Sequence, residues 1–299
     1  MTILVEGMPS IARGLDHVIH LVRDLDAAGE AYTRLGFLVG PENHHPFGTT
    51  NRIVQLPGFF IELLSIGDHA PIPEHGPSRF SFAAFHRDRL SRLGEGGSGL
   101  AVESRDAKAD ARAFEAAGVG GFETFAFERN GVGPNGSPLG LGFELAFAVD
   151  PASPAVCFFA CEHKRPQNFW SAAAQAHPNG AIGIGSAMFT AENPSDHHIF
   201  FDALTGVRDF RASSSGVAFD TPRGAIEILI PAAFAQRIGE PAAETSDVRL
   251  SALRLLVADL DQAEAASQGL AERRGNLLVT PASHLFGLTL VLEGATYAA

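Results

Sequence analysis

The chain has 299 residues, 45% of them hydrophobic and 19% charged, a composition typical of a globular protein with a substantial core and not of a disordered chain. Its formal net charge of −12, with no long basic run, makes nucleic acid and anionic membranes poor partners. Cys157 and Cys161 have no second pair to form a disulfide framework or a Cys-based zinc site, and neither a secretory signal nor an apolar run of about 18 residues is present, so we expect a cytoplasmic protein.

The first elements form a pattern of one strand, one helix and three strands. The segment from Asp16 to Val22 is apolar and strand-like, Asp24 starts a helix, and Gly36 supplies its stop. Residues 37–39, 50–56 and 59–66 then read as three short strands. The same strand-to-helix signature returns three times, with helix starts at Asp106, Asn193 and Asp259.

Near-equal repeats of this length indicate one supersecondary unit used four times. We place the units at about residues 14–66, 98–164, 180–230 and 248–294 and expect them to pair two by two. A boundary near Pro166 then gives two domains, 1–166 and 167–299, in keeping with the length of the chain.

The units carry motifs that resemble those of the vicinal oxygen chelate superfamily, which includes glyoxalase I, extradiol dioxygenases and bleomycin-resistance proteins. The motifs Leu15-Asp-His17-Val-Ile-His, His45-Pro-Phe-Gly-Thr-Thr-Asn51-Arg, Phe60-Ile-Glu62-Leu-Leu and His177-Pro-Asn-Gly180-Ala look like the glyoxalase-like branch. The resemblance implies an α+β fold in which four βαβββ units pair into two domains with cup-shaped mixed sheets. It also implies a divalent metal ion inside a cup, held by the first and last strands of the units.

The residues themselves point to His17 and Glu62. Strand alternation puts His17 on one face with Ile19, and Asp16 and His20 on the other. Glu62 interrupts an apolar strand, so it needs a cation, a shell of hydrogen bonds or open solvent. A metal ion bound by both residues meets that need; in the alternative, Glu62 faces water and His17 is a hydrogen-bonded interior histidine.

The second unit matches the family less well. Gly99 stands at the position that matches His17, and either Cys161 or His163 comes opposite Glu62, depending on the register. His17, Glu62 and His163 would form a two-histidine, one-carboxylate set for zinc, iron, manganese or nickel. The rival interpretation is a cup without metal that binds its ligand through polar side chains.

Three other side chains are candidates for substrate binding in the first cup. His45 and Asn51 either bind a polar substrate group or hold the turn at Gly48, and Glu144 can point into the cup from its strand. In the second half, Glu227 repeats the pattern of Glu62, but the matching positions hold Ser186 and Ala252. We therefore expect no metal ion there.

The resemblance implies a metal-dependent lyase, isomerase or dioxygenase that acts on a small oxygen-rich substrate, with Glu62 as ligand, base or both. The alternative is a metal-free sequestering protein of the bleomycin-resistance type. We expect a small molecule as the partner, with a homodimer as one option for assembly. A match to the dinucleotide fingerprint in residues 131–136 is discounted, because strand-like sequence and not a helix follows it.

Overall fold

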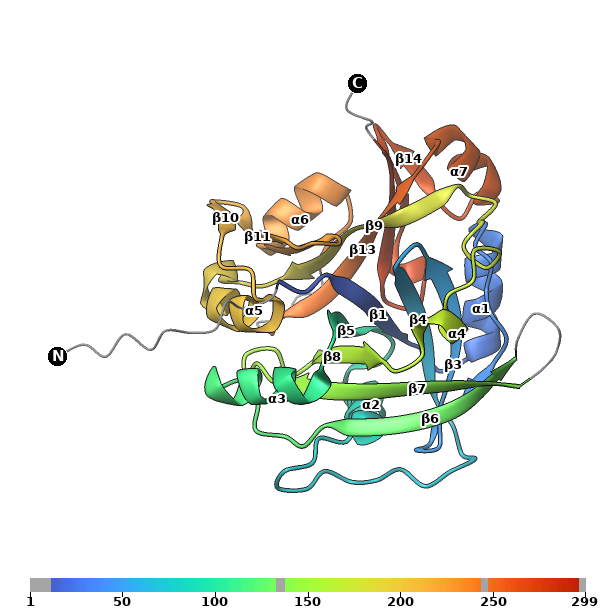
Figure 1. Cartoon of the computed structure of the whole chain (residues 1–299). Helices are drawn as coiled ribbons and strands as arrows, with labels where there is room; N and C mark the ends of the chain where they lie inside the picture. The colour runs from blue at the N-terminus through green and yellow to red at the C-terminus, as the bar shows by residue number, and fades with distance from the viewer. Residues whose placement is uncertain (1–11, 133–137, 243–246, 296–299) are drawn as a thin grey trace.

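The computed structural model describes residues 12–132, 138–242 and 247–295. Residues 133–137 of the discounted fingerprint lie outside this part, and a strand follows them, as expected. The two N-terminal units fill the lower part of Figure 1, and the two C-terminal units lie above them. Unit one contains β1 (Leu15–Leu21), α1 (Leu25–Arg34), β2 (Asn43–His44), β3 (Thr49–Leu56) and β4 (Phe59–Ile66); unit two contains β5 (Gly96–Ser104), α3 (Ala107–Ala116), β6 (Phe125–Val132), β7 (Pro138–Ala148) and β8 (Cys157–His163).

The C-terminal units repeat this order, and short helices connect the units. Unit three contains β9 (Ala181–Thr190), η1 (Pro194–His197), α5 (His198–Thr205), β10 (Phe210–Ser213), β11 (Gly216–Asp220) and β12 (Ala225–Leu229). Unit four contains β13 (Arg249–Val257), α7 (Leu260–Ala266), β14 (Glu272–Arg274), β15 (Leu277–Thr280), η2 (Ala282–His284) and β16 (Thr289–Gly294). The connecting helices are α2 (Phe82–Leu93), α4 (Pro166–Phe169) and α6 (Pro231–Ile238).

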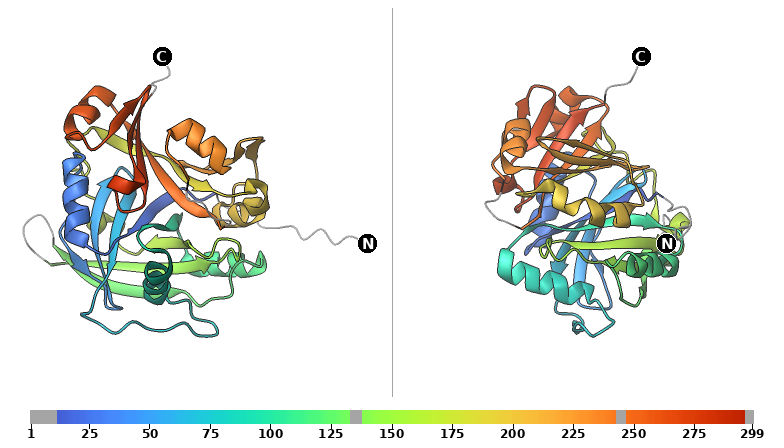
Figure 2. Two further views of the ribbon diagram at one scale, coloured as in Figure 1. Left: turned by 180° about the vertical axis from the view of Figure 1, so that it is seen from behind. Right: turned by 90° about the vertical axis from the view of Figure 1, so that its left-hand side faces the viewer.

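The units pair two by two, as predicted. Strand β1 lies antiparallel to β5 in the first half, and β9 lies antiparallel to β13 in the second. Within each unit the first strand is parallel to the last, so the sheets are mixed. The predicted α+β class with four βαβββ units is therefore confirmed. Figure 2 shows the two halves from behind and from the side.

Helices α1, α3 and α7 begin directly after the predicted aspartates, whereas the predicted start Asn193 precedes the 3₁₀ helix η1 and α5 begins only at His198. The side chains of Asp24, Asp106 and Asp259 cap α1, α3 and α7 by accepting hydrogen bonds from backbone N–H groups of the first turn. Gly206 ends α5 in the left-handed conformation, at a φ of 70°.

The predicted strand at residues 37–39 is wrong. The backbone of these residues pairs with no strand. Instead, the N–H of Leu38 donates a hydrogen bond to Nδ1 of His177, at 3.0 Å. The second strand of the unit is instead the two-residue β2, paired with β3 at Asn43 and Asn51. An apolar residue is present at position 37 because the Phe37 side chain is buried in the core, where it packs against Tyr32.

A β-bulge recurs in the first strand of every unit. Leu15 lies opposite Val102 and His17 opposite Ala101, so Asp16 is an extra residue in β1. The same irregularity makes Ser98, Gly185 and Ser251 the extra residues of β5, β9 and β13. The bulge therefore belongs to the repeated unit, and an acidic side chain occupies it only in unit one.

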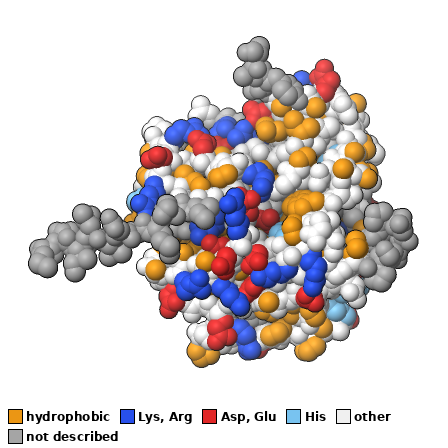
Figure 3. All heavy atoms as spheres, in the orientation of Figure 1, with side chains coloured by type: hydrophobic (Ala, Val, Ile, Leu, Met, Phe, Trp, Pro, Cys, Tyr) orange, Lys and Arg blue, Asp and Glu red, His pale blue; other side chains and the backbone are white. Residues whose placement is uncertain are grey.

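One hydrophobic cluster spans the two halves, and two further clusters lie around the first cup and within the second half. A single buried cluster contains Leu15 and Val18 from the first half together with Phe189 and Leu292 from the second. None of the helices in the described part of the chain is long and apolar enough to cross a membrane. On the face drawn in Figure 3, acidic and basic side chains are interspersed.

The division into two domains at Pro166 stays a prediction. The connecting helix α4 packs on the first cup, where Gln55 Nε2 donates to the carbonyl of Phe169 at 2.8 Å.

Candidate functional site

The first half contains an open cavity with about 40 Å³ of room for the centres of water-sized molecules. Its wall is mainly aromatic, and its polar groups come from β1, β3, β4, β6 and β8 and from the connection between β2 and β3, which carries His45. The predicted residues His17, His45, Asn51 and Glu62 all line it. The remaining side chains are those of Phe47, Ile53, Phe60, Phe82, Phe127, Arg129, Phe143, Leu145, Phe159, Cys161 and Phe169.

His17 is held by the bulge residue before it. Its Nδ1 lies 2.7 Å from Oδ2 of Asp16, and its ring stacks on Phe60 with centroids 4.2 Å apart. Asp16 also lies 3.2 Å from Nε2 of His163, through the same oxygen. Burial alone would raise the pKa of Asp16, but His163 and His17 lower that pKa below its ordinary value.

The ionised Asp16 fixes the tautomer of His17. A carboxylate only accepts hydrogen bonds, so Nδ1 of His17 carries the proton and donates it. Nε2 therefore presents a lone pair on the side of Glu62, whose Oε2 lies 3.8 Å away. A lone pair facing a carboxylate oxygen at this distance favours a cation between the two atoms.

Glu62 is buried and receives one direct hydrogen bond. Asn51 Nδ2 donates to its Oε1 at 2.6 Å, and His45 Nε2 lies 3.9 Å from the same oxygen. Burial raises the pKa of Glu62, while the Asn51 hydrogen bond and, when His17 is protonated, the charge of that imidazolium oppose the rise. The carboxylate is thus costly to ionise until a cation arrives.

A chain of side chains connects Glu62 to a charge on β6. Arg129 Nη1 donates to Oδ1 of Asn43 at 2.8 Å, and Asn43 Nδ2 donates to Oδ1 of Asn51 at 3.2 Å. Since Asn51 donates to Glu62, every bond in the chain runs from the guanidinium towards the carboxylate. Sequence analysis missed Arg129, although the alternation of Phe125, Phe127 and Arg129 would have placed it on an apolar strand face.

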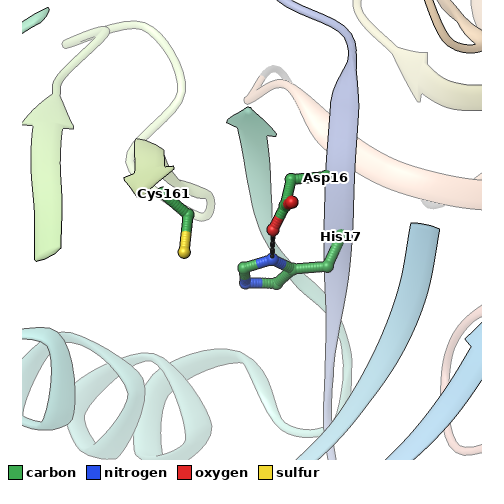
Figure 4. A group of neighbouring side chains, drawn as sticks. All are labelled: Asp16, His17 and Cys161. Carbon is green, nitrogen blue, oxygen red and sulfur yellow. Dashed lines mark hydrogen bonds and ion pairs between the residues drawn. The ribbon is translucent and has the colours of Figure 1, made fainter. Parts of the chain in front are cut away.

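The structure brings a different trio together more tightly than the predicted one. Asp16, His17 and Cys161 have donor atoms within 4.8 Å of one another, and no other such group occurs among the described residues (Figure 4). Strict alternation had put Asp16 on the opposite face of β1; the bulge brings it next to His17. Burial raises the pKa of Cys161, and the nearby carboxylates add to this, so its thiol stays protonated at neutral pH unless a metal binds it.

His163 lies beside the cavity and not opposite Glu62. Its Nε2 bonds Asp16, its buried Nδ1 has no hydrogen-bond partner, and its ring stacks on Trp170. By register, Gly99 pairs with Cys157 as His17 pairs with Phe60, so Phe159 matches Glu62 in the second unit. The metal-ligand roles of His17, Glu62 and His163 stay predictions.

Glu144 does not line the cavity. Its neighbours Phe143 and Leu145 do, so Glu144 lies on the other face of β7. There its Oε1 accepts a hydrogen bond from Thr124 at 2.7 Å, and its Oε2 pairs with Lys164 at 2.6 Å. This placement gives Glu144 no contact with the cavity.

In the second half, arginines surround the carboxylate that matches Glu62. Glu227 pairs with Arg254, at 3.0 Å between Nη2 and Oε1, and with Arg237. Arg254 also pairs with Glu293 and donates to the hydroxyl of Ser186. Guanidinium groups thus already supply the positive charge that Glu227 needs, which supports the prediction that no metal ion binds there.

A profile of the glyoxalase-like domain family matches residues 15–205. The chain belongs to this family. The predicted membership of the vicinal oxygen chelate superfamily is confirmed. A sequence search of curated proteins gives no match.

Solved structures share the fold of this glyoxalase-like protein at low sequence identity. A hypothetical protein from Staphylococcus aureus is 12% identical, with a TM-score of 0.67 over 95% of this chain and 100% of that one. A xylose isomerase-like TIM barrel/4-hydroxyphenylpyruvate dioxygenase fusion protein is 14% identical, with a TM-score of 0.54 over 100% of this chain and 52% of that one. A mutant 4-hydroxymandelate synthase from Streptomyces coelicolor is 9% identical, with a TM-score of 0.52 over 98% of this chain and 95% of that one.

Proposed function

We propose that the first cup binds a divalent metal ion between His17 and Glu62 and that the protein acts on a small oxygen-containing substrate in the adjoining cavity, as a lyase, isomerase or dioxygenase. The observation that carries this proposal is the position of His17 Nε2 in the cavity wall, 3.8 Å from Oε2 of Glu62. Two donors bound to one ion at about 2.1 Å lie roughly 3 to 4 Å apart, so the pair is spaced to share an ion.

The support of His17 by Asp16 fits the same role. A metal-binding histidine usually donates its second ring N–H to a carboxylate, which orients the ring and makes the ligand more basic. Asp16 accepts such a bond at 2.7 Å. Zinc, iron, manganese and nickel all accept this set of nitrogen and oxygen donors, so the donor types do not single out one metal.

When bound, the ion would act as a Lewis acid on a substrate oxygen. Glu62 would hold the ion through Oε2, and for Glu62 to act as the base its Oε1 would give up the hydrogen bond from Asn51 and take the proton of the substrate. The phenyl rings of the wall would exclude water and pack on the apolar part of the substrate. In this scheme His163 either completes the ligand set or orients Asp16.

The alternative is a metal-free protein that binds a small molecule in the same cup. The direct hydrogen bond from Asn51 to Glu62, together with the raised pKa of Glu62, favours it, because a neutral carboxyl group needs no ion. In this case His17 and Glu62 would change ligand affinity only.

Elemental analysis of the purified protein separates the two functions. After dialysis against each metal and then against buffer, we expect the parent to keep a stoichiometric divalent ion and His17→Ala and Glu62→Gln to lose it. Glu144→Gln makes the same change on the other face of the sheet and should keep the ion. A parent that retains no metal, or a Glu62→Gln variant that retains as much as the parent, would refute the metal-dependent function.

A further inference from the structure

Arg129 lines the first cavity without a direct ion pair to the described part of the chain, and the carboxylate of Glu62 attracts it from beyond ion-pair distance. Among the described residues no carboxylate lies within 4.0 Å of its guanidinium, and its Nη1 donates a hydrogen bond to the neutral amide of Asn43. Its Nε is buried and has no hydrogen-bond partner. By contrast, the cavity-remote Arg254 is paired with two carboxylates. Arg129 therefore has donors available for a molecule in the cavity.

The charges around the cavity indicate what that molecule carries. Without a metal ion, the carboxylate of Glu62 attracts the guanidinium of Arg129 and offsets part of its charge. A divalent ion at the proposed site would balance the two negative charges of Asp16 and Glu62 and leave the positive charge of Arg129 for an anion in the cavity. A planar guanidinium matches a carboxylate with two parallel hydrogen bonds, and it stays protonated at any physiological pH. The hydrogen-bonded chain runs from Arg129 to Glu62, and Glu62 would repel a ligand carboxylate placed at its end of the chain. The favourable position for a ligand carboxylate is therefore next to Arg129.

We propose that Arg129 binds the carboxylate of a monoanionic substrate whose aromatic or other apolar body packs among the phenylalanine rings. This names the substrate class of the proposed function and rests on that function for the reaction. The bound ion would strengthen acid binding by balancing Glu62, and the donors of Arg129 on the cavity wall provide the binding contact with or without the ion. One guanidinium compensates one charge, so a monocarboxylate suits the site better than a doubly charged phosphate. The opposite end of the substrate would then face His17 and Glu62.

The test compares aromatic acids with their neutral amides. Phenylacetate and 3-phenylpropanoate are titrated against phenylacetamide and 3-phenylpropanamide by calorimetry. The fluorescence of Trp170 provides a second readout, since this sole tryptophan contacts Phe169 of the cavity wall, with ring centroids 4.9 Å apart. We expect the parent to bind each acid at least about tenfold more tightly than its amide, as charged hydrogen bonds would produce.

Substitution of Arg129 should remove this preference. We expect Arg129→Gln to weaken acid binding about 10- to 100-fold and to leave amide binding nearly unchanged, while Arg129→Lys keeps part of the preference. Arg165→Gln is the matched control, because Arg165 pairs with Glu128 outside the cavity. Circular dichroism checks that each variant is folded.

The outcomes separate this inference from the proposed function. The titrations are made on chelator-treated and on metal-loaded protein. Acid preference that depends on Arg129 without any metal uptake would support the inference and refute the metal-dependent function. Metal uptake with acids that bind no more tightly than amides, or that do not bind at all, would overturn the inference. The acid-to-amide ratio of the parent decides this even if Arg129→Gln fails to fold.

Discussion

At the scale of single residues, Asp16 is the most constrained group of the site. It is buried, it is ionised, and one of its oxygens accepts bonds from both His17 and His163. Replacing it with asparagine keeps the shape but puts a neutral amide where two imidazole N–H groups need an anion. The consequence should reach both stability and metal binding.

We predict that Asp16→Asn lowers metal affinity by about 10- to 100-fold, as loss of an outer-shell carboxylate does. It should also lower the free energy of unfolding by about 1–3 kcal/mol. Competition with a metal indicator and urea denaturation measure the two effects. Asp150→Asn is the control, because Oδ2 of Asp150 lies 2.8 Å from Nδ1 of His197 at a place remote from the cavity. This substitution should lower stability and leave metal affinity unchanged. Equal metal affinities for parent and Asp16→Asn would contradict the positioning role.

A second residue-scale prediction concerns pH. Burial lowers the pKa of His20 to about 4, against 6.5 for a free imidazole, and its ring nitrogens bond Tyr32 and the carbonyl of Phe286. Between pH 6.5 and 4 the unfolded chain binds a proton at this residue and the folded chain does not, so stability falls as the pH falls.

His20 should account for about 3 kcal/mol of this loss. Urea denaturation of the parent and of His20→Gln at pH 7 and pH 4 measures it. We expect the variant to start less stable at pH 7 but to lose less on acidification. A variant that loses as much as the parent would show that His20 is protonated in the folded state.

At this scale the sequence predicted half of the site. His17 and Glu62 were identifiable because each is a polar exception on an apolar strand, and such a residue needs a partner or solvent. Asp16 was not, because alternation along a regular strand has no means of locating a bulge. Glu144 was wrongly predicted to point into the cavity. Its sequence identified an apolar strand, but the pairing register of that strand, which the sequence does not show, decides which face meets the cavity.

At the scale of elements, the bulge at Asp16 and the glycine opposite Ile19, which is Gly99, shape the site. Gly99 takes the position that matches His17, and a Cβ there would lie 2.6 Å from Cδ1 of the fully buried Ile19. The second unit therefore has no side chain at the position that matches His17, because Ile19 of the first unit occupies that space. A larger residue would displace Ile19 and, through β1, His17.

We predict that Gly99→Ala lowers the free energy of unfolding by about 1–3 kcal/mol through overpacking. Gly183→Ala in β9 is the matched control, because a Cβ there meets nothing within 4 Å, and its stability should be unchanged or slightly higher. Chemical denaturation compares the two variants. Equal effects of the two substitutions would contradict the packing argument.

The elements themselves followed from the sequence where local signals were strong. Aspartate caps and terminal glycines marked the helices, because those residues satisfy backbone groups at helix ends. The predicted strand at 37–39 failed because its apolar residues serve the core, while its backbone bonds a histidine from 139 residues further along the chain. Local pattern carries no information on such a contact.

At the scale of the whole molecule, the shared core predicts that both halves unfold together. Arg223 of the second half donates to the carbonyl of Leu15 at 3.0 Å and pairs with Glu103 at 2.9 Å. His177 donates to the carbonyl of Gln55 at 2.6 Å. Because of these contacts and the common hydrophobic cluster, each half would expose apolar surface if the other half unfolded.

We therefore expect a single unfolding transition in urea, with coincident curves from Trp170 fluorescence and from far-ultraviolet circular dichroism. Trp170 reports on the first cup, whereas circular dichroism reports on both halves. Two separated transitions would show that the halves are independent domains. The repeat pattern predicted the pairing of units but not this shared core, which depends on side-chain packing between distant segments.

The most direct test of the proposed metal site is a crystal structure of the metal-loaded protein, with anomalous scattering recorded at the absorption edge of the metal. We predict one strong anomalous peak in the first cup, about 2.0–2.3 Å from Nε2 of His17 and from an oxygen of Glu62. A metal peak at Glu227 in the second half, or metal-loaded crystals with no peak between His17 and Glu62, would contradict it.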